Sequence, residues 1–195
     1  GIMASLKDKK FFLLDMDGTI YLDNELFDGT LDFLSEVKAR GGKYLFVTNN
    51  SSKSVDAYVN KLQGLGISVD ETNFLTSTDA TILYLKANYP DKCFYAMGTD
   101  SFLKQLRKSD INIVTDITDD VFGLIISNDN ELTFKKLDDA CRLLTRGVGA
   151  YIATNPDWVC PTSYGYVPDC GCYSYADDNY YDSYYIQLEP ITLFL

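Results

Sequence analysis

Short apolar runs alternate with amphipathic stretches along most of the 195-residue chain. Such runs are typical of strands inside a sheet, and the first two, each followed by polar residues, are expected to be buried on both faces. Strands that alternate with helices predict parallel βαβ units and therefore an α/β fold. The predicted strands cover residues 11–14, 44–47, 93–97, 111–114, 121–126 and 150–154.

The segments between these strands repeat apolar residues every three or four positions, as one face of a helix does. Several of them end at a glycine, which favours the left-handed backbone of a helix end. Thr133 is the expected cap of one helix, and Gly147 marks its expected end. A short hairpin is predicted within 20–27, turning through Asp23 and Asn24. The helices are expected to begin near residues 31, 55, 78, 100 and 134.

Charge and hydropathy argue against nucleic acid and membranes as partners of this protein. The chain carries 28 acidic and 17 basic residues, a formal net charge of -11 at pH 7. Nucleic-acid binders gather lysine and arginine on one face, so nucleic acid is not an expected partner. No apolar run approaches the roughly 20 residues that a membrane helix needs, and no signal-peptide pattern is visible, so no membrane partner is expected. We expect a cytoplasmic protein.

The absence of histidine removes several mechanisms. Ser-His-Asp catalysis, Cys-His catalysis and histidine-bound zinc all need an imidazole, and the chain has none. Its five cysteines are odd in number and lack the paired CxxC spacing of zinc sites, so we expect reduced thiols. Proton transfer then falls to carboxylates, lysine, tyrosine or cysteine.

Two carboxylates follow the first predicted strand. Asp15 ends the apolar run, and Asp17 comes two residues later, before Gly18 and Thr19. Ligands bind at the carboxyl ends of strands in an open α/β sheet. There one carboxylate can attack phosphorus, while a second passes a proton to the leaving oxygen and later takes one from water. The pair favours phosphoryl chemistry over the alternatives, an acidic turn or a calcium-type loop.

Polar residues also follow two other predicted strands. Thr48 can donate a hydrogen bond to a phosphoryl oxygen, and nearby backbone N–H groups can add to it. Helix capping by this cluster is the alternative. Asn155 and Asp157 follow the strand at 150–154 and are candidates for facing the substrate. The alternative there is an ordinary Asn-Pro-Asp turn.

These motifs resemble those of the haloacid dehalogenase superfamily and, within it, the NagD-like 4-nitrophenylphosphatase group. Residues 15–19 match the DxDGT form of its first motif, and Thr48 and Asn49 match its second. Residues 153–157 and 167–171 are similar to the group's inserted cap. The resemblance implies a Rossmann-like core with a parallel sheet and an inserted α/β cap domain. The expected division is 1–77 for the first half of the core, 78–172 for the cap and 173–195 for a divergent tail in place of the second half.

The resemblance also implies roles for single residues. Asp15 would be the nucleophile that forms an aspartyl-phosphate, and Asp17 would be the general acid and base. Mg2+ would sit on the Asp15 carboxylate and the Asp17 main-chain carbonyl. The substrate would be a small phosphorylated metabolite, and a homo-oligomeric state is left open. The remaining implied residues are Met16, Gly18, Thr48 and Asn49 around the phosphoryl group, and Asn155 and Asp157 in the cap.

Two parts of the family pattern are missing from the chain. No lysine follows Lys136, and Asp178 and Asp182 have the spacing of the acidic metal motif without a strand before them. Two aspartates and a phosphoryl group repel one another unless such groups offset their charge. The missing groups favour one alternative, a catalytically impaired binding or regulatory fragment. A phosphomutase or phosphotransferase would use the same aspartates, whereas Asp17 and the inserted cap argue against a phospho-accepting signalling domain. We also expect part of 184–195 to form a strand beside 11–14.

Overall fold

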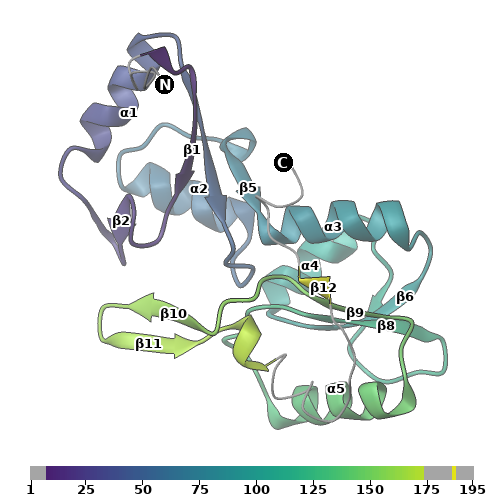
Figure 1. The fold of residues 1–195 in the computed structure, drawn as a ribbon. Helices are drawn as coiled ribbons and strands as arrows, with labels where there is room; N and C mark the ends of the chain where they lie inside the picture. Colours follow the sequence, from purple (N-terminus) through teal and green to yellow (C-terminus); the bar gives the residue numbers. More distant parts are fainter. Residues whose placement is uncertain (1–7, 174–185, 188–195) are drawn as a thin grey trace, which may run out of the picture. The chain divides into compact units, whose positions relative to one another are not determined.

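The chain divides into two compact units. The computed structural model describes residues 8–173 and 186–187 (Figure 1). Unit 1 contains the residues up to Thr48 together with 55–75, and unit 2 contains residues 49–54 together with those from Thr76 onward. The chain therefore passes between the units after Thr48, before Val55 and before Thr76, and the short segment 49–54 groups with residues far from it in sequence.

Unit 1 is built on a three-stranded sheet in the order β1-β4-β5, in which β1 and β4 run parallel. Asp15 pairs with Val47, so these two strands end at the same edge. The predicted hairpin after β1 is confirmed, with Asp23 and Asn24 at its turn. The elements are β1 (Phe11–Asp15), β2 (Tyr21–Leu22), β3 (Glu25–Leu26), α1 (Thr30–Ala39), β4 (Lys43–Thr48), α2 (Val55–Gly64), a 3-10 turn (Glu71–Asn73) and β5 (Phe74–Thr76).

The strand β1 is buried on one face only. Phe12 and Leu14 pack against the core that the sheet shares with α1 and α2. The alternate residues Phe11 and Leu13 are 58% and 55% exposed. The prediction that this strand is buried on both faces was wrong. Successive side chains of a strand point to opposite faces, and a continuous apolar run does not by itself show that both faces are covered.

Unit 2 contains a five-stranded, entirely parallel sheet in the order β12-β9-β8-β6-β7. Figure 1 shows α3 and α4 on one side of this sheet and α5 on the other. Among the described residues, no helix combines the length and apolar character that crossing a membrane requires. The elements are α3 (Ser77–Asn88), β6 (Cys93–Met97), α4 (Asp100–Lys108), β7 (Ile113–Val114), β8 (Val121–Ile126), α5 (Phe134–Arg146), β9 (Ala150–Ala153) and β12 (Ile186–Gln187).

Alternation along the strands divides the core of unit 2 into two layers. Phe94 and Ala96 of β6 pack toward α3 and α4, whereas Tyr95 and Met97 pack toward α5. Both faces of β6 are therefore apolar, as expected for a parallel strand covered by helices on both sides. The predicted cap of α5 is confirmed, because the Thr133 hydroxyl accepts the Lys136 N–H.

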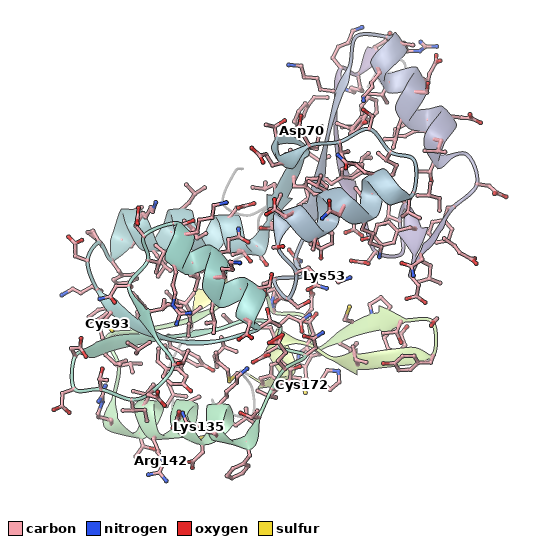
Figure 2. The ribbon with its side chains drawn as sticks, turned by 180° about the vertical axis from the view of Figure 1, so that it is seen from behind. Lys53, Asp70, Cys93, Lys135, Arg142 and Cys172 are labelled. Carbon is pink, nitrogen blue, oxygen red and sulfur yellow. The ribbon has the colours of Figure 1, made fainter. Side chains whose placement is uncertain are left out.

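The outer side of α5 is charged. Figure 2 shows Lys135 and Arg142 on this helix. Lys135 pairs with Asp139 at 2.6 Å, and Arg142 pairs with Asp138 at 2.7 Å, each pair four residues apart. The Arg142–Asp138 pair is exposed and stabilises the helix only slightly, whereas the Asp139 side chain is 13% exposed and also accepts the Tyr95 hydroxyl at 2.9 Å.

The sequence pattern missed β5 and a second hairpin. This hairpin pairs β10 (Val159–Thr162) with β11 (Gly165–Pro168) in antiparallel register. Each of its strands contains a proline, Pro161 and Pro168, which removes a ladder donor and argues against a strand in sequence. The hairpin is isolated from the larger sheets, and a two-stranded ribbon can carry proline where its donors face outward.

The expected pairing of the tail with β1 was wrong for the residues that the structure describes. Ile186 and Gln187 do form a short strand, but it pairs with Ile152 and Ala153 of β9. The pairing gives partners to backbone groups of β9 that would otherwise lie at a sheet edge. Residues 184–185 and 188–195, and also Asp178 and Asp182, lie outside the described residues.

Replacing Leu85 by alanine should destabilise unit 2 by about 2–5 kcal/mol, because this side chain is 1% exposed and fills the core beneath α3. Leu83 lies in the same helix but is 52% exposed. Leu83→Ala should therefore change the free energy of unfolding by less than about 0.5 kcal/mol. Urea unfolding followed by circular dichroism measures both variants. Equal losses would contradict the assigned buried face of α3.

Candidate functional site

A tight turn carries the two carboxylates beyond β1. The carbonyl of Met16 accepts the N–H groups of Thr19 and Ile20, both at 3.0 Å, and Gly18 donates to the carbonyl of Tyr21 at 2.8 Å. Gly18 has a φ of 80°, a left-handed conformation that side-chain-bearing residues rarely adopt. The glycine of the motif therefore allows the chain to reverse directly after Asp15, which keeps both carboxylates at the end of the strand.

The surroundings of these carboxylates differ. Asp15 is exposed, and its Oδ2 accepts a hydrogen bond from the Thr19 hydroxyl at 3.0 Å. Asp17 is half-buried and forms a backbone bridge with Tyr21. Burial, and after it the negative charge of Asp17, raise the pKa of the Tyr21 hydroxyl well above its usual value. Tyr21 therefore stays protonated beside the carboxylate at any physiological pH.

A positive charge lies close to this turn. The ammonium of Lys61, on α2, is 3.9 Å from the centre of the Tyr21 ring. A cation over the face of an aromatic ring is attracted to it by about 0.5–2 kcal/mol. Sequence reasoning missed both Tyr21 and Lys61, because nothing in the spacing links a hairpin tyrosine with a helical lysine 40 positions later.

The neighbouring strand brings Thr48 to the same edge. Because Asp15 pairs with Val47 in parallel register, Thr48 follows directly beyond the pair. Its side chain is buried, so the hydroxyl is held in one place rather than free in solvent. Unit 1 thus gathers Asp15, Met16, Asp17, Gly18 and Thr48 at the carboxyl edge of β1 and β4.

The donor set of this edge fits a magnesium ion. Mg2+ prefers oxygen ligands and is commonly held by one or two carboxylates together with substrate phosphate. Asp15 offers a carboxylate, and the turn's hydrogen bonds converge on the carbonyl of Met16 rather than that of Asp17. The Asp17 carbonyl is thereby suited to a metal. Within the described ranges, no group of three or more His, Cys, Asp or Glu gathers as a metal site.

Unit 2 brings together three other predicted residues. Asn155 is fully buried, and its Nδ2 donates to Asp157 Oδ2 at 3.1 Å and to Asp169 Oδ1 at 3.3 Å. The same oxygen of Asp157 accepts the Asn49 side-chain amide at 3.5 Å. Asn49, Asn155 and Asp157 are therefore members of one hydrogen-bonded cluster, although 106 positions separate the first two in sequence.

Asp169 completes this cluster and was not among the predicted site residues. Its carboxylate is buried, and burial raises its pKa, against the opposing effect of hydrogen bonds from the Cys170 N–H and Asn155. The adjacent Gly171 comes so close to Pro156 that a Cβ atom would lie 2.1 Å from the Pro156 carbonyl oxygen. This close approach explains the glycine after Cys170, and the Gly171 N–H joins the two ends of the β10–β11 hairpin by donating to the Asp157 carbonyl at 2.8 Å.

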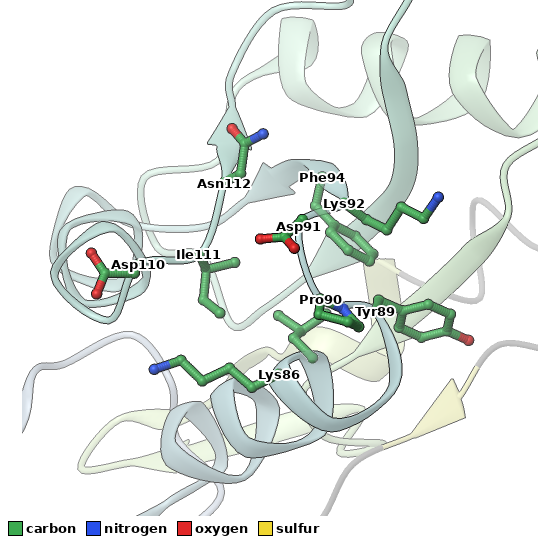
Figure 3. Close-up of a pocket in the computed structure, with 10 residues that line it drawn as sticks. Lys86, Tyr89, Pro90, Asp91, Lys92, Phe94, Asp110, Ile111 and Asn112 are labelled. Atoms are coloured by element: carbon green, nitrogen blue, oxygen red, sulfur yellow. The ribbon is translucent and has the colours of Figure 1, made fainter.

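A cavity of about 460 Å3 lies elsewhere in unit 2, at the amino-terminal ends of β6 and β7 (Figure 3). Its charged lining consists of two lysines and two aspartates, so it lacks the excess of positive charge that would favour a phosphate group. Ligands of parallel sheets bind at the opposite, carboxyl ends. We therefore do not assign the site to this cavity. The charged residues are Lys86, Asp91, Lys92 and Asp110.

Comparison with known proteins places the chain in a family. The sequence profile of the haloacid dehalogenase-like hydrolases matches residues 12–112. An acid sugar phosphatase of Staphylococcus aureus is 31% identical over 166 residues, which cover 85% of this chain and 63% of that protein. The crystal structure of a 4-nitrophenylphosphatase from Thermotoga maritima matches with a TM-score of 0.85 and 32% sequence identity. The match covers 94% of this chain and 69% of the Thermotoga chain.

A solved structure named after NagD has the same TM-score of 0.85 and 32% identity, with 92% of this chain and 70% of the other covered. The chain spans 63% of the length of the acid sugar phosphatase it matches. The profile match includes the DxDGT turn and Thr48, and the solved structures share the parallel α/β arrangement described above. The chain belongs to the haloacid dehalogenase-like hydrolases, within their NagD-like group.

Proposed function

We propose that the chain forms part of a phosphatase that hydrolyses small phosphomonoesters, with Asp15 as the nucleophile and Mg2+ as the cofactor. The observation that carries the proposal is the pair of carboxylates at the end of β1, next to Thr48 at the end of its parallel neighbour β4. The names of two relatives, an acid sugar phosphatase and a 4-nitrophenylphosphatase, support this class of reaction.

The reaction proceeds in two displacements on phosphorus. In the first, a carboxylate oxygen of Asp15 attacks the phosphorus atom, the ester P–O bond breaks, and Asp17 gives its proton to the leaving alcohol oxygen. In the second, Asp17 takes a proton from water while the water oxygen attacks the aspartyl-phosphate. The bond between phosphorus and Asp15 breaks, which releases inorganic phosphate and restores the Asp15 carboxylate and the protonated Asp17.

Negative charge is the main obstacle to this chemistry. A dianionic phosphoryl group must approach Asp15 and Asp17, and unit charges about 4 Å apart repel each other by about 4 kcal/mol near a protein surface. Mg2+, held by the Asp15 carboxylate and the Asp17 carbonyl, would offset this charge. From the chain itself, the Thr48 hydroxyl and the backbone and amide N–H groups of Asn49 donate to the phosphoryl oxygens.

The relatives and the second unit support the proposed class of substrate. An acid sugar phosphatase matches 85% of this chain, which supports a sugar phosphate or a similarly small phosphorylated metabolite. We assign the choice of substrate to unit 2 as the inserted cap, with the half-buried Asp157 facing the ligand and the buried Asn155 holding its carboxylate by a hydrogen bond. This division leaves the phosphoryl chemistry to unit 1 and recognition of the rest of the molecule to unit 2.

The proposed activity is tested in an extended form of the protein, which also carries the lysine and acidic motif implied by the family resemblance. In this extended form, hydrolysis of 4-nitrophenyl phosphate should require Mg2+ and stop when EDTA removes the metal. The physical reason is that a single lysine does not neutralise the two aspartates and the phosphate dianion without the metal ion. Release of 4-nitrophenolate is read from its absorbance. Full turnover in EDTA would contradict the proposed metal dependence.

In the form that also carries the lysine and acidic motif, Asp15→Asn should lower kcat by a factor on the order of 10^4 or more, because an amide cannot form the acyl-phosphate. Asp23→Asn is the matched control, since Asp23 is an exposed turn residue of the neighbouring hairpin with a φ of 50° that asparagine tolerates. Wild-type turnover by Asp15→Asn would rule out this nucleophile.

Thr48→Ala should reduce kcat by roughly a hundredfold, because it removes one hydrogen-bond donor to the phosphoryl oxygens. Thr48→Ser keeps the hydroxyl and should recover most of the rate. Steady-state kinetics on both variants separates loss of the donor from loss of packing, since serine also lacks the methyl group. If serine and alanine were equally slow, the hydroxyl would not be the functional group.

A further inference from the structure

The segment 49–54 belongs to unit 2 although both of its neighbours in sequence belong to unit 1. It begins with Asn49, directly after the last residue of β4, and ends before α2. Six residues that join a strand to the next helix would ordinarily lie with them, because consecutive elements are usually adjacent in space and their connections are short. Specific contacts with unit 2 must therefore hold this segment away from its sequence neighbours.

Ser51 is at the centre of these contacts. Its side chain is fully buried. The Ser51 hydroxyl accepts the backbone N–H of Asn128 at 3.0 Å and lies 3.0 Å from the Thr154 hydroxyl. Asn128 follows β8 and Thr154 follows β9, so one hydroxyl joins the segment to the carboxyl ends of two adjacent strands.

The residues on either side of Ser51 are held by their backbone carbonyls. Thr99, beyond the end of β6, donates its hydroxyl to the Ser52 carbonyl at 3.0 Å. Ser77, the first residue of α3, donates to the Asn49 carbonyl at 2.8 Å. With Ser51 between them, the segment crosses the carboxyl ends of β6, β8 and β9. These are the strand ends at which a parallel sheet binds ligands.

A second serine in the segment has no such role. The Ser52 hydroxyl is half-buried and donates to Asn50 Oδ1 inside the segment, at 2.6 Å. Removing it leaves every bond to the strands in place. Removing the Ser51 hydroxyl, in contrast, leaves a buried backbone N–H of Asn128 without its acceptor, which is the costly kind of loss. The two serines therefore provide a matched comparison.

We propose that Ser51 is a positioning residue, which fixes segment 49–54 on the strand ends of unit 2 and thereby orients the Asn49 amide. That amide carries two hydrogens. One points to Asp157, which also accepts from Asn155, and the other can donate to a phosphoryl oxygen. The phosphate contact of Asn49 is then set by unit 2 and not by β4. The part that concerns phosphate rests on the proposed function.

The anchoring is tested by hydrogen exchange on the chain itself. In Ser51→Ala, the amide protons of Asn128 and of residues 50–52 should exchange about tenfold faster, because local opening becomes easier. Ser52→Ala should leave these rates unchanged, and the amides of α5 should keep theirs in both variants. Exchange in Ser51→Ala within twofold of wild type would overturn the proposal. Should Ser51→Ala fail to fold, Ser51→Cys replaces the hydroxyl by a weak acceptor of similar size, and exchange within twofold of wild type there would overturn the proposal equally.

Positioning of Asn49 is tested in the form that also carries the lysine and acidic motif, by titrating wild type and both serine variants with inorganic phosphate and Mg2+ while observing the Asn49 side-chain amide by NMR. Ser51→Ala should raise the Kd for phosphate by about five- to tenfold, and Ser52→Ala should not change it. Equal Kd values in wild type and Ser51→Ala would show that Ser51 does not position Asn49. If wild type binds no phosphate, the proposed function fails, and the exchange rates alone decide whether Ser51 is the anchor.

Discussion

Parallel pairing of β1 with β4 is the constraint on which the site of unit 1 depends. It sets Asp15 opposite Val47 and therefore brings Thr48 to the edge that carries the DxDGT turn. A shift of one residue would move every side chain of a strand to the other face of the sheet. Packing of Phe12 and Leu14 against α1 and α2 opposes such a shift. The apolar core thus fixes the register, and the register places the reactive groups.

The buried carboxylates of this acidic chain have stabilising partners that the exposed carboxylate of Asp15, the proposed nucleophile, does not need. Asp129 has a fully buried side chain that pairs with Lys136 at 2.8 Å. Asp169 is held by amide donors instead, from Cys170 and Asn155. Burial of an ionised group is costly without such partners. Asp15 is exposed and accepts a hydroxyl, an arrangement that leaves its other oxygen open to solvent and to a substrate.

Elements with strong local signals were predicted well. The apolar runs of β6 and β8 and the Thr133 cap and Gly147 end of α5 all lie where the sequence pattern indicated. The strand β5 is only three residues long, and the β10–β11 hairpin contains prolines, so neither has a strand pattern. The two-faced burial expected for β1 failed because the apolar run does not show which neighbours cover it. Tertiary packing decides that exposure.

The sequence by itself determined the turn that carries the carboxylates, because the DxDGT spacing and a glycine with positive φ act within five residues. Only the tertiary structure decided where Asn49 lies. Its sequence neighbour Thr48 belongs to one unit, whereas Asn49 is hydrogen-bonded with Asp157 in the other, 108 positions away. Local preferences act over a few residues. Contacts such as that of Ser51 with Thr154 exist only after distant strands have paired and their carboxyl ends lie side by side.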